Sequence, residues 1–368
     1  MTRRVALGAL ADLDGLGFDA LIDARSPAEY AESHLPGAIS LPVMSNEERA
    51  RVGTLYKSSR FQARRLGAAL LTRNVAAHLE GALADRPSGF RPLVYCWRGG
   101  QRSGAFALIL GQIGWQAAVL EGGWRSWRRL VVEALYERPF PAPLWVLDGN
   151  TGTGKTAVLG RVAARGGQVI DLEALAGHRG SVFGLAPGAV QPAQKGFEEA
   201  LAMAMARLDP GRPVLVEAES SAIGRIRLPP VLWQAIRAAP RVELRAPLAA
   251  RARFAARDYA AVTADRGVLA ERLAALAPFH ARTVLAEWQA MAAAGADTDL
   301  AAALMAAHYD PRYARQQARQ APPVAVLETD DLASAALDSV AEGVMAVMDR
   351  QTGQSENQPV HRKSGLIG

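Results

Sequence analysis

The sequence has one cysteine, Cys96, among its 368 residues. This excludes an internal disulfide and any zinc site built from several cysteines, so a single thiol carries all the thiol chemistry of the chain. Long apolar runs are also missing. No stretch reaches the roughly 18 uninterrupted apolar residues of a membrane-spanning helix, and Asp12 interrupts the first residues before a signal-like segment develops. These absences predict a cytoplasmic protein with no membrane partner.

Lysine is scarce as well. The only lysines are Lys57, Lys155, Lys195 and Lys363, so nearly all of the positive charge is arginine. The formal net charge of +6 favours a polyanionic partner, and arginine makes bidentate contacts to phosphate wherever it clusters. The arginine-rich run 245–257 suits either a solvated helix face or a nucleic-acid patch.

The length predicts two domains, because domains of soluble proteins hold roughly 150 residues. Short apolar runs that alternate with helical patterns predict an α/β fold with a mainly parallel sheet. In the first domain, 1–138, strands are expected at 20–23 and 92–95 and a helix at 103–113. A proline-rich stretch, 139–143, marks the boundary.

The second domain is also predicted to be α/β and to span 142–350. Its strands are expected at 144–147, 168–171, 213–217, 241–244 and 324–327. An alanine- and arginine-rich helical region, about 247–320, is inserted between the last two strands. The polar end, 351–368, has no apolar period and is predicted to be a disordered tail.

Cys96 directly follows an expected strand and opens the run Cys96-Trp-Arg-Gly-Gly-Gln-Arg102, which leads into a helix. Backbone N–H groups at such a glycine-containing turn converge on one point, and the helix N-terminus adds positive potential. Arg98 and Arg102 supply further charge, and these features lower the pKa of a thiol and make its thiolate available as a nucleophile. An isolated cysteine is otherwise a small buried apolar residue. The neighbouring arginines and glycines favour a catalytic loop that binds an anion.

A second loop, Gly149-Asn-Thr-Gly152-Thr-Gly154-Lys155-Thr156, matches the phosphate-binding loop (P-loop) G-x-x-x-x-G-K-[ST] between an expected strand and helix. Its backbone amides are expected to bind a diphosphate, with Lys155 reaching the oxygens and Thr156 near a magnesium ion. The motif specifies a diphosphate and not the group attached to it. Glu217 and Glu219 occupy the place of the companion acid of an NTPase, where aspartate is usual, and either could hold magnesium through water.

Further polar residues follow other strands of the second domain. Asp171 and Glu173 end a strand, and His178 and Arg179 come next, in a loop at the carboxyl end where parallel sheets place ligands. His178 and Arg179 are expected either to contact a phosphate or substrate or to form a solvated surface loop. The segment Tyr309-Asp-Pro-Arg-Tyr313 suits either a nucleobase-stacking edge or a helix stop.

Several of these stretches together resemble known families. Asp23-Ala-Arg25, the run His34 to Ala38, the Cys96 loop and the run Leu120 to Trp124 resemble a rhodanese domain over about residues 5–130. Rhodaneses carry sulfur or selenium on that cysteine. The stretch from Cys96 to Arg102 is longer than the usual sulfurtransferase loop, and a wider ring suits a phosphorus-centred anion. With the P-loop and the later motifs following in order, the chain closely resembles the tRNA 2-selenouridine synthase family over about residues 5–330.

That resemblance implies a transferase that modifies the wobble uridine of the tRNAs for Lys, Glu and Gln. Its implied co-substrates are geranyl diphosphate, which supplies a geranyl group to the sulfur of 2-thiouridine, and selenophosphate, which supplies the selenium of 2-selenouridine. Alkylation turns the sulfur into a better leaving group, so geranylation prepares selenation. On this assignment Lys155 and magnesium hold the departing diphosphate. Cys96 handles the selenium step, while Arg98 and Arg102 bind selenophosphate.

Two other functions stay open. One is an ATP-dependent sulfurtransferase or kinase that acts on a small molecule, which nucleotide turnover would distinguish. The other is a non-catalytic regulator that binds nucleotide and senses redox state through Cys96. The complete set of Lys155, Thr156 and both loop arginines argues against a regulator.

Overall fold

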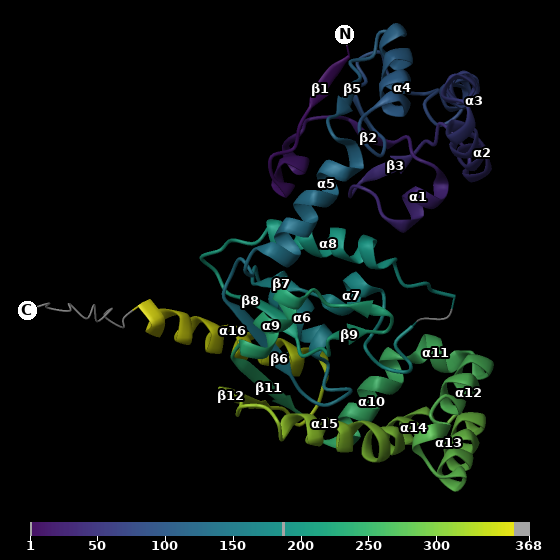
Figure 1. Ribbon diagram of the computed structural model, residues 1–368. Coiled ribbons are helices and arrows are strands. Elements are labelled where there is room, and N and C mark those ends of the chain that lie inside the picture. The colour runs from purple at the N-terminus through teal and green to yellow at the C-terminus, as the bar shows by residue number, and fades with distance from the viewer. Residues whose placement is uncertain (1, 186–187, 357–368) are drawn as a thin grey trace, which may run out of the picture. The chain divides into compact units, whose positions relative to one another are not determined.

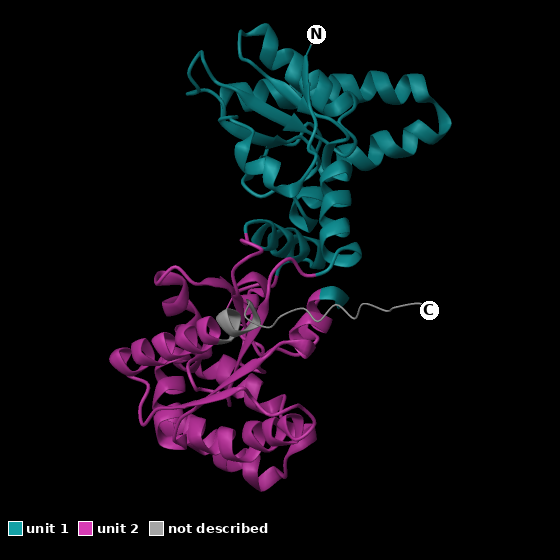
Figure 2. Cartoon of the chain, turned by 90° about the vertical axis from the view of Figure 1, so that its left-hand side faces the viewer, with its two compact units in different colours: residues 1–139, 192–207, 229–231 teal, residues 140–191, 208–228, 232–368 magenta. Residues whose placement is uncertain are grey.

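The computed structural model describes residues 2–185 and 188–356. They form two compact units, which Figure 2 colours separately. Unit 1 consists of Met1–Pro139, Pro192–Arg207 and Pro229–Val231, and unit 2 of Phe140–Gln191, Leu208–Leu228 and Leu232–Gly368. The main division falls after Pro139, in the proline-rich stretch. Unit 1 also takes a helix from within the 142–350 segment that the sequence assigned to the second domain.

The sheet of unit 1 has five parallel strands in the order β1-β5-β4-β2-β3. The strands are β1 (Arg3–Val5), β2 (Ala20–Asp23), β3 (Ala38–Ser40), β4 (Pro92–Tyr95) and β5 (Ala118–Leu120). β4 is buried along its whole length, as expected for a strand of a parallel sheet that is covered on both faces. The predicted strands 20–23 and 92–95 and the parallel sheet are confirmed.

Helices surround this sheet (Figure 1). They are η1 (Leu10–Gly15), α1 (Pro27–Glu32), α2 (Asn46–Ser58), α3 (Arg60–Glu80), α4 (Gln101–Gln112), α5 (Gly123–Val132), η2 (Glu133–Glu137) and α8 (Gln194–Ala206). Val75 of α3 and Phe106 of α4 share one buried core with Ile22 and Val94 of the sheet. α8 packs on η1, α1 and α5. Its seven buried residues explain why it belongs to unit 1, although its sequence lies among the strands of unit 2.

Unit 2 contains a second sheet of five parallel strands, in the order β12-β11-β6-β8-β7. The strands are β6 (Leu144–Asp148), β7 (Gln168–Ile170), β8 (Val214–Glu217), β11 (Arg241–Arg245) and β12 (Ala325–Glu328), and a separate hairpin joins β9 (Ala222–Ile223) to β10 (Ile226–Arg227). The expected strands are all present. Because the strands are parallel, the carboxyl ends of β6, β7 and β8 lie on the same edge of the sheet.

The helices of unit 2 fall into two groups. Those that accompany the sheet are α6 (Lys155–Ala164), α7 (Leu172–Ala176), α9 (Pro230–Ala238) and α16 (Ser334–Glu356). Those of the insertion are α10 (Leu248–Asp258), α11 (Ala260–Ala264), α12 (Arg266–Ala274), η3 (Ala277–Phe279), α13 (Arg282–Ala294), α14 (Asp297–Leu304), η4 (Met305–Tyr309) and α15 (Asp310–Gln317). The insertion has its own core around Leu273 and Trp288, which confirms the helical region predicted at about 247–320.

The predicted tail, 351–368, begins inside α16, which runs to Glu356. The prediction of disorder is therefore wrong for 351–356, because these residues continue a helix whose preceding turns bury Val344, Val347 and Met348. Residues 357–368 lie outside the described part of the chain. No helix among the described residues has the length and apolar character needed to cross a membrane.

Candidate functional site

The Cys96 loop of unit 1 rests on a turn made by Gly122 and Gly123. The Trp124 N–H donates to the Cys96 carbonyl at 2.8 Å. Gly99 and Gly123 both have positive φ, and a Cβ on Gly123 would lie 2.3 Å from the Cys96 oxygen and 2.4 Å from the Gly99 nitrogen. Only glycine fits this approach of two backbones. The Leu120-Glu-Gly-Gly-Trp124 run therefore supports the shape of the loop.

Cys96 is 3% exposed and lies at the carboxyl end of β4, just before α4. The Ser103 hydroxyl donates to its sulfur at 3.2 Å. Burial acts to raise the pKa of the Cys96 thiol, but hydrogen bonds from Ser103 and the charge of Arg102 lower it on balance. The loop thus favours a thiolate, as its sequence indicates. Ser103, which is not among the site residues predicted from the sequence, is a hydrogen-bond partner of the thiol.

The two loop arginines have different surroundings. Arg98 is exposed, whereas Arg102 donates to Glu29 at 3.0 Å. Arg49 contacts the same carboxylate at 2.9 Å. Although burial acts to raise the pKa of Glu29, its bonds to Arg102, Ser26 and Arg49 lower it. Arg102 is thereby held beside the thiol, and an incoming anion would share its guanidinium with Glu29.

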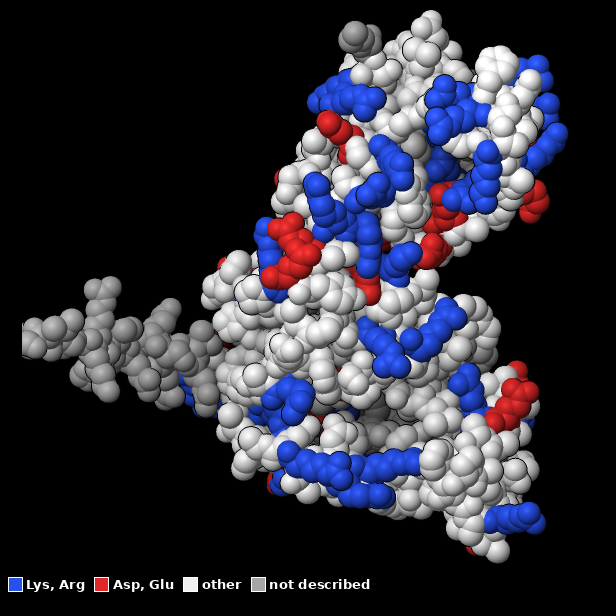
Figure 3. All heavy atoms as spheres, viewed as in Figure 1, with Lys and Arg blue, Asp and Glu red and all other residues white. Residues whose placement is uncertain are grey.

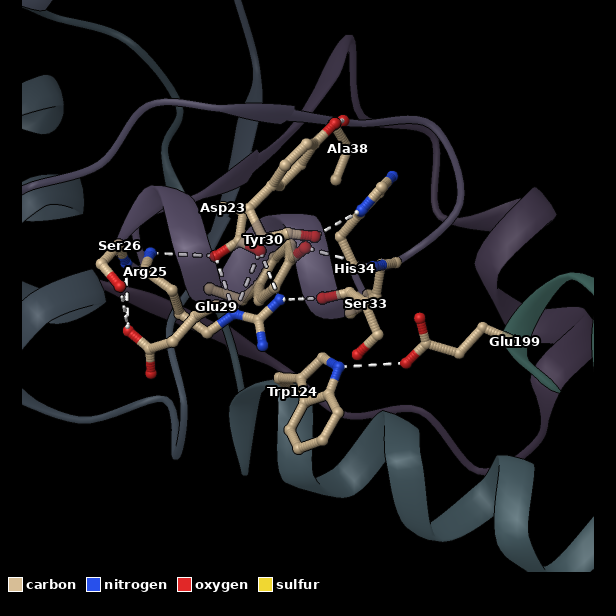
Figure 4. Close-up of polar contacts among 12 residues, drawn as sticks. Asp23, Arg25, Ser26, Glu29, Tyr30, Ser33, His34, Ala38, Trp124 and Glu199 are labelled. Carbon is tan, nitrogen blue, oxygen red and sulfur yellow. Dashed lines mark hydrogen bonds and ion pairs between the residues drawn. The ribbon is translucent and has the colours of Figure 1, made fainter. Parts of the chain in front are cut away.

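A buried polar network lies beneath this loop (Figure 4). Arg25 is 1% exposed, and its Nη2 atom lies 2.6 Å from Asp23 Oδ2 and 2.5 Å from the Ser33 carbonyl oxygen. The Arg25 guanidinium also stacks over the ring of Trp124, 5.1 Å from its centroid. The Asp-Ala-Arg motif therefore holds in place the residue that follows the Gly122-Gly123 turn.

The other end of Trp124 contacts α8. Its indole N–H donates to Glu199 Oε1 at 3.0 Å (Figure 4). Burial raises the pKa of Glu199 to about 7, and the Trp124 bond and the charge of Arg128 offset this only in part. No sequence pattern points to Glu199, because its partner is 75 residues away in the chain.

In unit 2, β6 runs into the P-loop and α6 follows it. Lys155 Nζ donates to the Gly149 carbonyl at 2.8 Å. Burial acts to lower the pKa of Lys155, but nearby Tyr313, Glu217, Glu219 and Glu173 raise it well above its usual value. The ammonium group is therefore fully protonated and available to an anion at neutral pH.

Three carboxylates meet beside the P-loop. One oxygen from each of Glu173, Glu217 and Glu219 lies within 4.8 Å of the others. Burial and mutual repulsion raise the pKa of Glu173 and Glu217 to about 8 and that of Glu219 to about 7, against the opposing charge of Lys155. Thr156 Oγ1 is 3.3 Å from Glu173 Oε2. The structure thus brings together acids that the sequence placed after two different strands.

These groups line one cavity of about 690 Å³. Its lining also includes His178, Arg179 and Asp171 from the sequence prediction. Asp171 accepts from the Ala174 N–H at 2.8 Å and so caps α7, while Arg179 is paired with Asp258 at 2.8 Å. Burial lowers the pKa of His178, with help from the charge of Arg272, so this ring is neutral at pH 7.

The insertion completes the cavity. Tyr309, Arg312 and Tyr313 line it. α15 continues from η4, so of the two alternatives for 309–313 the helix stop is wrong. Pro311 lies just after the π-helical turn η4, where the regular i→i−4 hydrogen bonding of an α-helix is already interrupted. Arg251 is buried and donates to both Asp310, at 2.8 Å, and the Thr151 carbonyl, at 3.1 Å. Arg251 therefore links the P-loop to the insertion, and the run 245–257 is not uniformly a solvated face.

Comparisons with known proteins agree with this division. A family model for a rhodanese-like domain matches residues 7–130, which include Cys96. A model for the tRNA 2-selenouridine synthase AAA domain matches residues 142–286, which include the P-loop. A tRNA 2-selenouridine synthase of Cupriavidus pinatubonensis is 36% identical over 266 residues, which cover 70% of this chain and 69% of that protein. The chain belongs to the tRNA 2-selenouridine synthase family.

Two other tRNA 2-selenouridine synthases show the same similarity. The protein of Alcanivorax borkumensis is 38% identical over 247 residues, and that of Hahella chejuensis is 39% identical over 251 residues. Each match covers 65% of this chain, and the chain spans 66% and 63% of the two relatives. In this member of the tRNA 2-selenouridine synthase family, the thiol loop and the P-loop belong to different units.

Proposed function

We propose that this chain modifies the wobble uridine of tRNA in two steps. A geranyl group passes from geranyl diphosphate to the sulfur of 2-thiouridine, and selenium from selenophosphate then replaces the alkylated sulfur to give 2-selenouridine. The tRNAs for Lys, Glu and Gln are the proposed substrates. The observation that carries the proposal is the pair of loops, one with a thiol whose pKa is lowered and one with a P-loop lysine.

The first step is assigned to unit 2. The thiouridine sulfur bonds to C1 of the geranyl group while the C1–O bond breaks, and the diphosphate leaves with the bonding electrons. The uridine N3 proton is released to solvent. The P-loop amides and Lys155 face the departing charge, which is the charge that grows in the transition state. An allyl transfer of this kind uses a P-loop without nucleotide hydrolysis.

The carboxylates around the P-loop fit a magnesium ion. Mg²⁺ prefers oxygen ligands, and Glu173, Glu217 and Glu219 present oxygens within 4.8 Å of one another. Glu217 is buried, and its Oε1 has no hydrogen-bond partner in the described structure. The Thr156 hydroxyl adjoins the same group. These residues would hold the ion, which would neutralise charge on the diphosphate when bound.

The second step is assigned to the Cys96 loop. The loop amides and Arg98 bind the selenophosphate anion, and the Cys96 thiolate attacks its phosphorus. The P–Se bond breaks and selenide leaves. Selenide bonds to C2 of the uracil ring while the C2–S bond breaks and geranyl thiolate departs, and water later hydrolyses the phosphocysteine. Each bond change is redox-neutral, so no added oxidant or reductant is required.

A basic helical hairpin in unit 1 supports an RNA partner. α2 and α3 pack side by side, and Figure 3 shows basic side chains over the part of unit 1 that holds them. Tyr56 and Phe61, near the hairpin tip, are 45% and 71% exposed. Exposed rings among cations suit stacking on bases beside a phosphate backbone. The exposed basic residues of the hairpin are Arg49, Arg51, Lys57, Arg60, Arg64, Arg65 and Arg73.

The P-loop motif by itself also suits a second function, an ATP-dependent sulfurtransferase or kinase that acts on a small molecule. Such an enzyme would turn over nucleotide at the same P-loop. Steady phosphate release from ATP that depends on a small sulfur acceptor, with no change in tRNA nucleosides, would favour it over the tRNA function.

Mass analysis of tRNA nucleosides tests the proposed function. Transfer RNA that carries 2-thiouridine is incubated with the protein and with geranyl diphosphate or selenophosphate, which are added separately and together. Lys155→Ala should lower geranyl transfer on the order of a hundredfold or more, because a charge that stabilises the leaving group is lost. Lys195→Ala, which removes an exposed lysine paired with Glu32 in unit 1, should be unaffected. Normal geranylation by Lys155→Ala would contradict the assignment of the diphosphate.

A further inference from the structure

Unit 2 contains a second cavity, of about 70 Å³, beside the large one. Phe183, Leu269, Leu300 and Leu304 form much of its apolar wall. Thr151, Tyr259 and Tyr309 line both cavities, so the two adjoin. This small apolar cavity lies between the insertion and the residues Thr151, Ser181 and Phe183, and it has no part in the assignments made so far.

Most polar groups of the small cavity are already engaged, and the exception is the Tyr309 hydroxyl, which has no hydrogen-bond partner in the described structure and belongs to a residue that also lines the large cavity. Asp297 accepts from Arg266 at 2.6 Å, and the Thr263 hydroxyl donates to the Ala260 carbonyl at 3.3 Å. The Ser181 hydroxyl accepts from the Phe183 N–H at 3.2 Å. A nucleobase or sugar would lose hydrogen bonds to water on entering and gain few in return. A hydrocarbon would lose none.

The small cavity also reaches the P-loop. Met305 is one of its lining residues, and a Cβ on Gly152 would lie only 2.5 Å from Met305 Cε. One side chain therefore separates the cavity from the loop that binds phosphate. A ligand with a diphosphate head and an apolar tail suits both neighbours at once.

We propose that the small cavity binds the terminal isoprene unit of an allylic diphosphate and so sets the chain length that the enzyme accepts. This inference rests on the proposed function. A water molecule occupies roughly 10–15 Å³ by the same measure of cavity volume, so about 70 Å³ accepts roughly five to seven small groups. That is the size of one five-carbon unit. The first isoprene unit of a geranyl chain then lies in the large cavity and the second in the small one, and a third unit would exceed the volume of the small cavity.

Filling the small cavity tests this assignment. Ala301 on α14 lines it, while the next residue, Ala302, does not and is equally half-buried. Ala301→Leu places a branched side chain in the cavity, and Ala302→Leu is the matched control. Calorimetry would compare geranyl diphosphate, dimethylallyl diphosphate and inorganic diphosphate as ligands of the full chain. A chain-length series of the same allylic diphosphates would then be tested for transfer to 2-thiouridine tRNA.

Ala301→Leu should lower the affinity for geranyl diphosphate at least roughly tenfold, because the second isoprene unit loses its apolar site. Binding of dimethylallyl diphosphate and inorganic diphosphate should stay within about twofold of the unmodified chain, and transfer preference should move toward dimethylallyl. Ala302→Leu should change none of these values. If Ala301→Leu leaves the preference for geranyl intact while remaining folded, the small cavity does not hold the chain. If the unmodified chain transfers no allylic group at all, the proposed function itself fails.

Discussion

The carboxyl group of Glu199 should make the stability of unit 1 depend on pH. It is buried on α8, accepts from the Trp124 indole and has a pKa raised from 4.5 to about 7. Below about pH 4.5 it is protonated in both folded and unfolded chains. Between pH 4.5 and about 7 the unfolded chain releases the proton while the folded chain keeps it, so stability falls as pH rises through this window.

The shift sets the size of the effect. One pKa unit corresponds to about 1.4 kcal/mol, so the charged carboxylate destabilises the folded state by roughly 3 kcal/mol above pH 7. Glu199→Gln keeps an oxygen that can accept from Trp124 and has no charge to bury. The variant should therefore match the unmodified chain near pH 5 and exceed its stability by a few kcal/mol at pH 8.

Urea unfolding followed by tryptophan fluorescence at pH 5 and pH 8 measures this difference. The neighbouring residue gives a control of opposite sign. Burial acts to raise the pKa of Glu198, but its bonds to Tyr136, Arg128 and Gln194 lower it, so its charge stabilises unit 1 at both pH values. Glu198→Gln should therefore be less stable than the unmodified chain at both pH 5 and pH 8. Equal stability of Glu199→Gln and the unmodified chain at pH 8 would refute the reasoning, since it would mean that the charged carboxylate is not penalised in place.

Other predictions concern the reaction and the RNA. Cys96→Ser keeps the size of the side chain and removes the low-pKa thiol, so geranylated tRNA should accumulate without 2-selenouridine by mass analysis; loss of both products in a folded variant would point to one shared site. Gly123→Ala forces a Cβ into the Cys96 loop at a positive φ, worth about 1–3 kcal/mol in strain alone, and should abolish selenation but spare geranylation. Affinity for tRNA should fall roughly 10³-fold between about 50 and 200 mM salt if the hairpin contacts about six phosphates. Replacing Arg60, Arg64 and Arg65 with alanine should make this dependence of affinity on salt less steep in filter-binding assays. Affinity that does not change with ionic strength would contradict an RNA partner.

Most of the parallel sheet could be predicted from the sequence, because buried strands such as Pro92–Tyr95 are continuous apolar runs. The sequence does not predict β1 (Arg3–Val5), β3 (Ala38–Ser40) or β5 (Ala118–Leu120), because each has only three residues, and the two arginines of β1 are exposed as well. The placement of α8 was also missed. The apolar residues of α8 predict that the helix is buried, but they do not predict which of the two units it packs in.

The sites show the same contrast. The P-loop follows from its motif, since spacing along the chain determines its geometry. The difference between Arg98 and Arg102 does not, because it depends on Glu29, 73 residues from Arg102. The sequence predicts each of the three glutamates beside Lys155 as a site residue. That they raise one another's pKa becomes evident only when β7 and β8 are paired in the sheet.

The position of α8 has a consequence for how the chain is made and divided. A fragment that ends at Pro139 lacks the helix that contacts α5 and supplies Glu199 to Trp124, so it would expose apolar surface that the whole chain buries. On the ribosome, unit 1 cannot pack α8 until Arg207 has emerged, after β6, the P-loop and β7 of unit 2 have already been synthesised. The last segment of unit 1, Pro229–Val231, emerges later still. The two units are therefore synthesised in alternating segments. Cleavage at the proline-rich stretch would divide the chain but would not yield two complete units, because α8 of unit 1 lies on the other side of the cut.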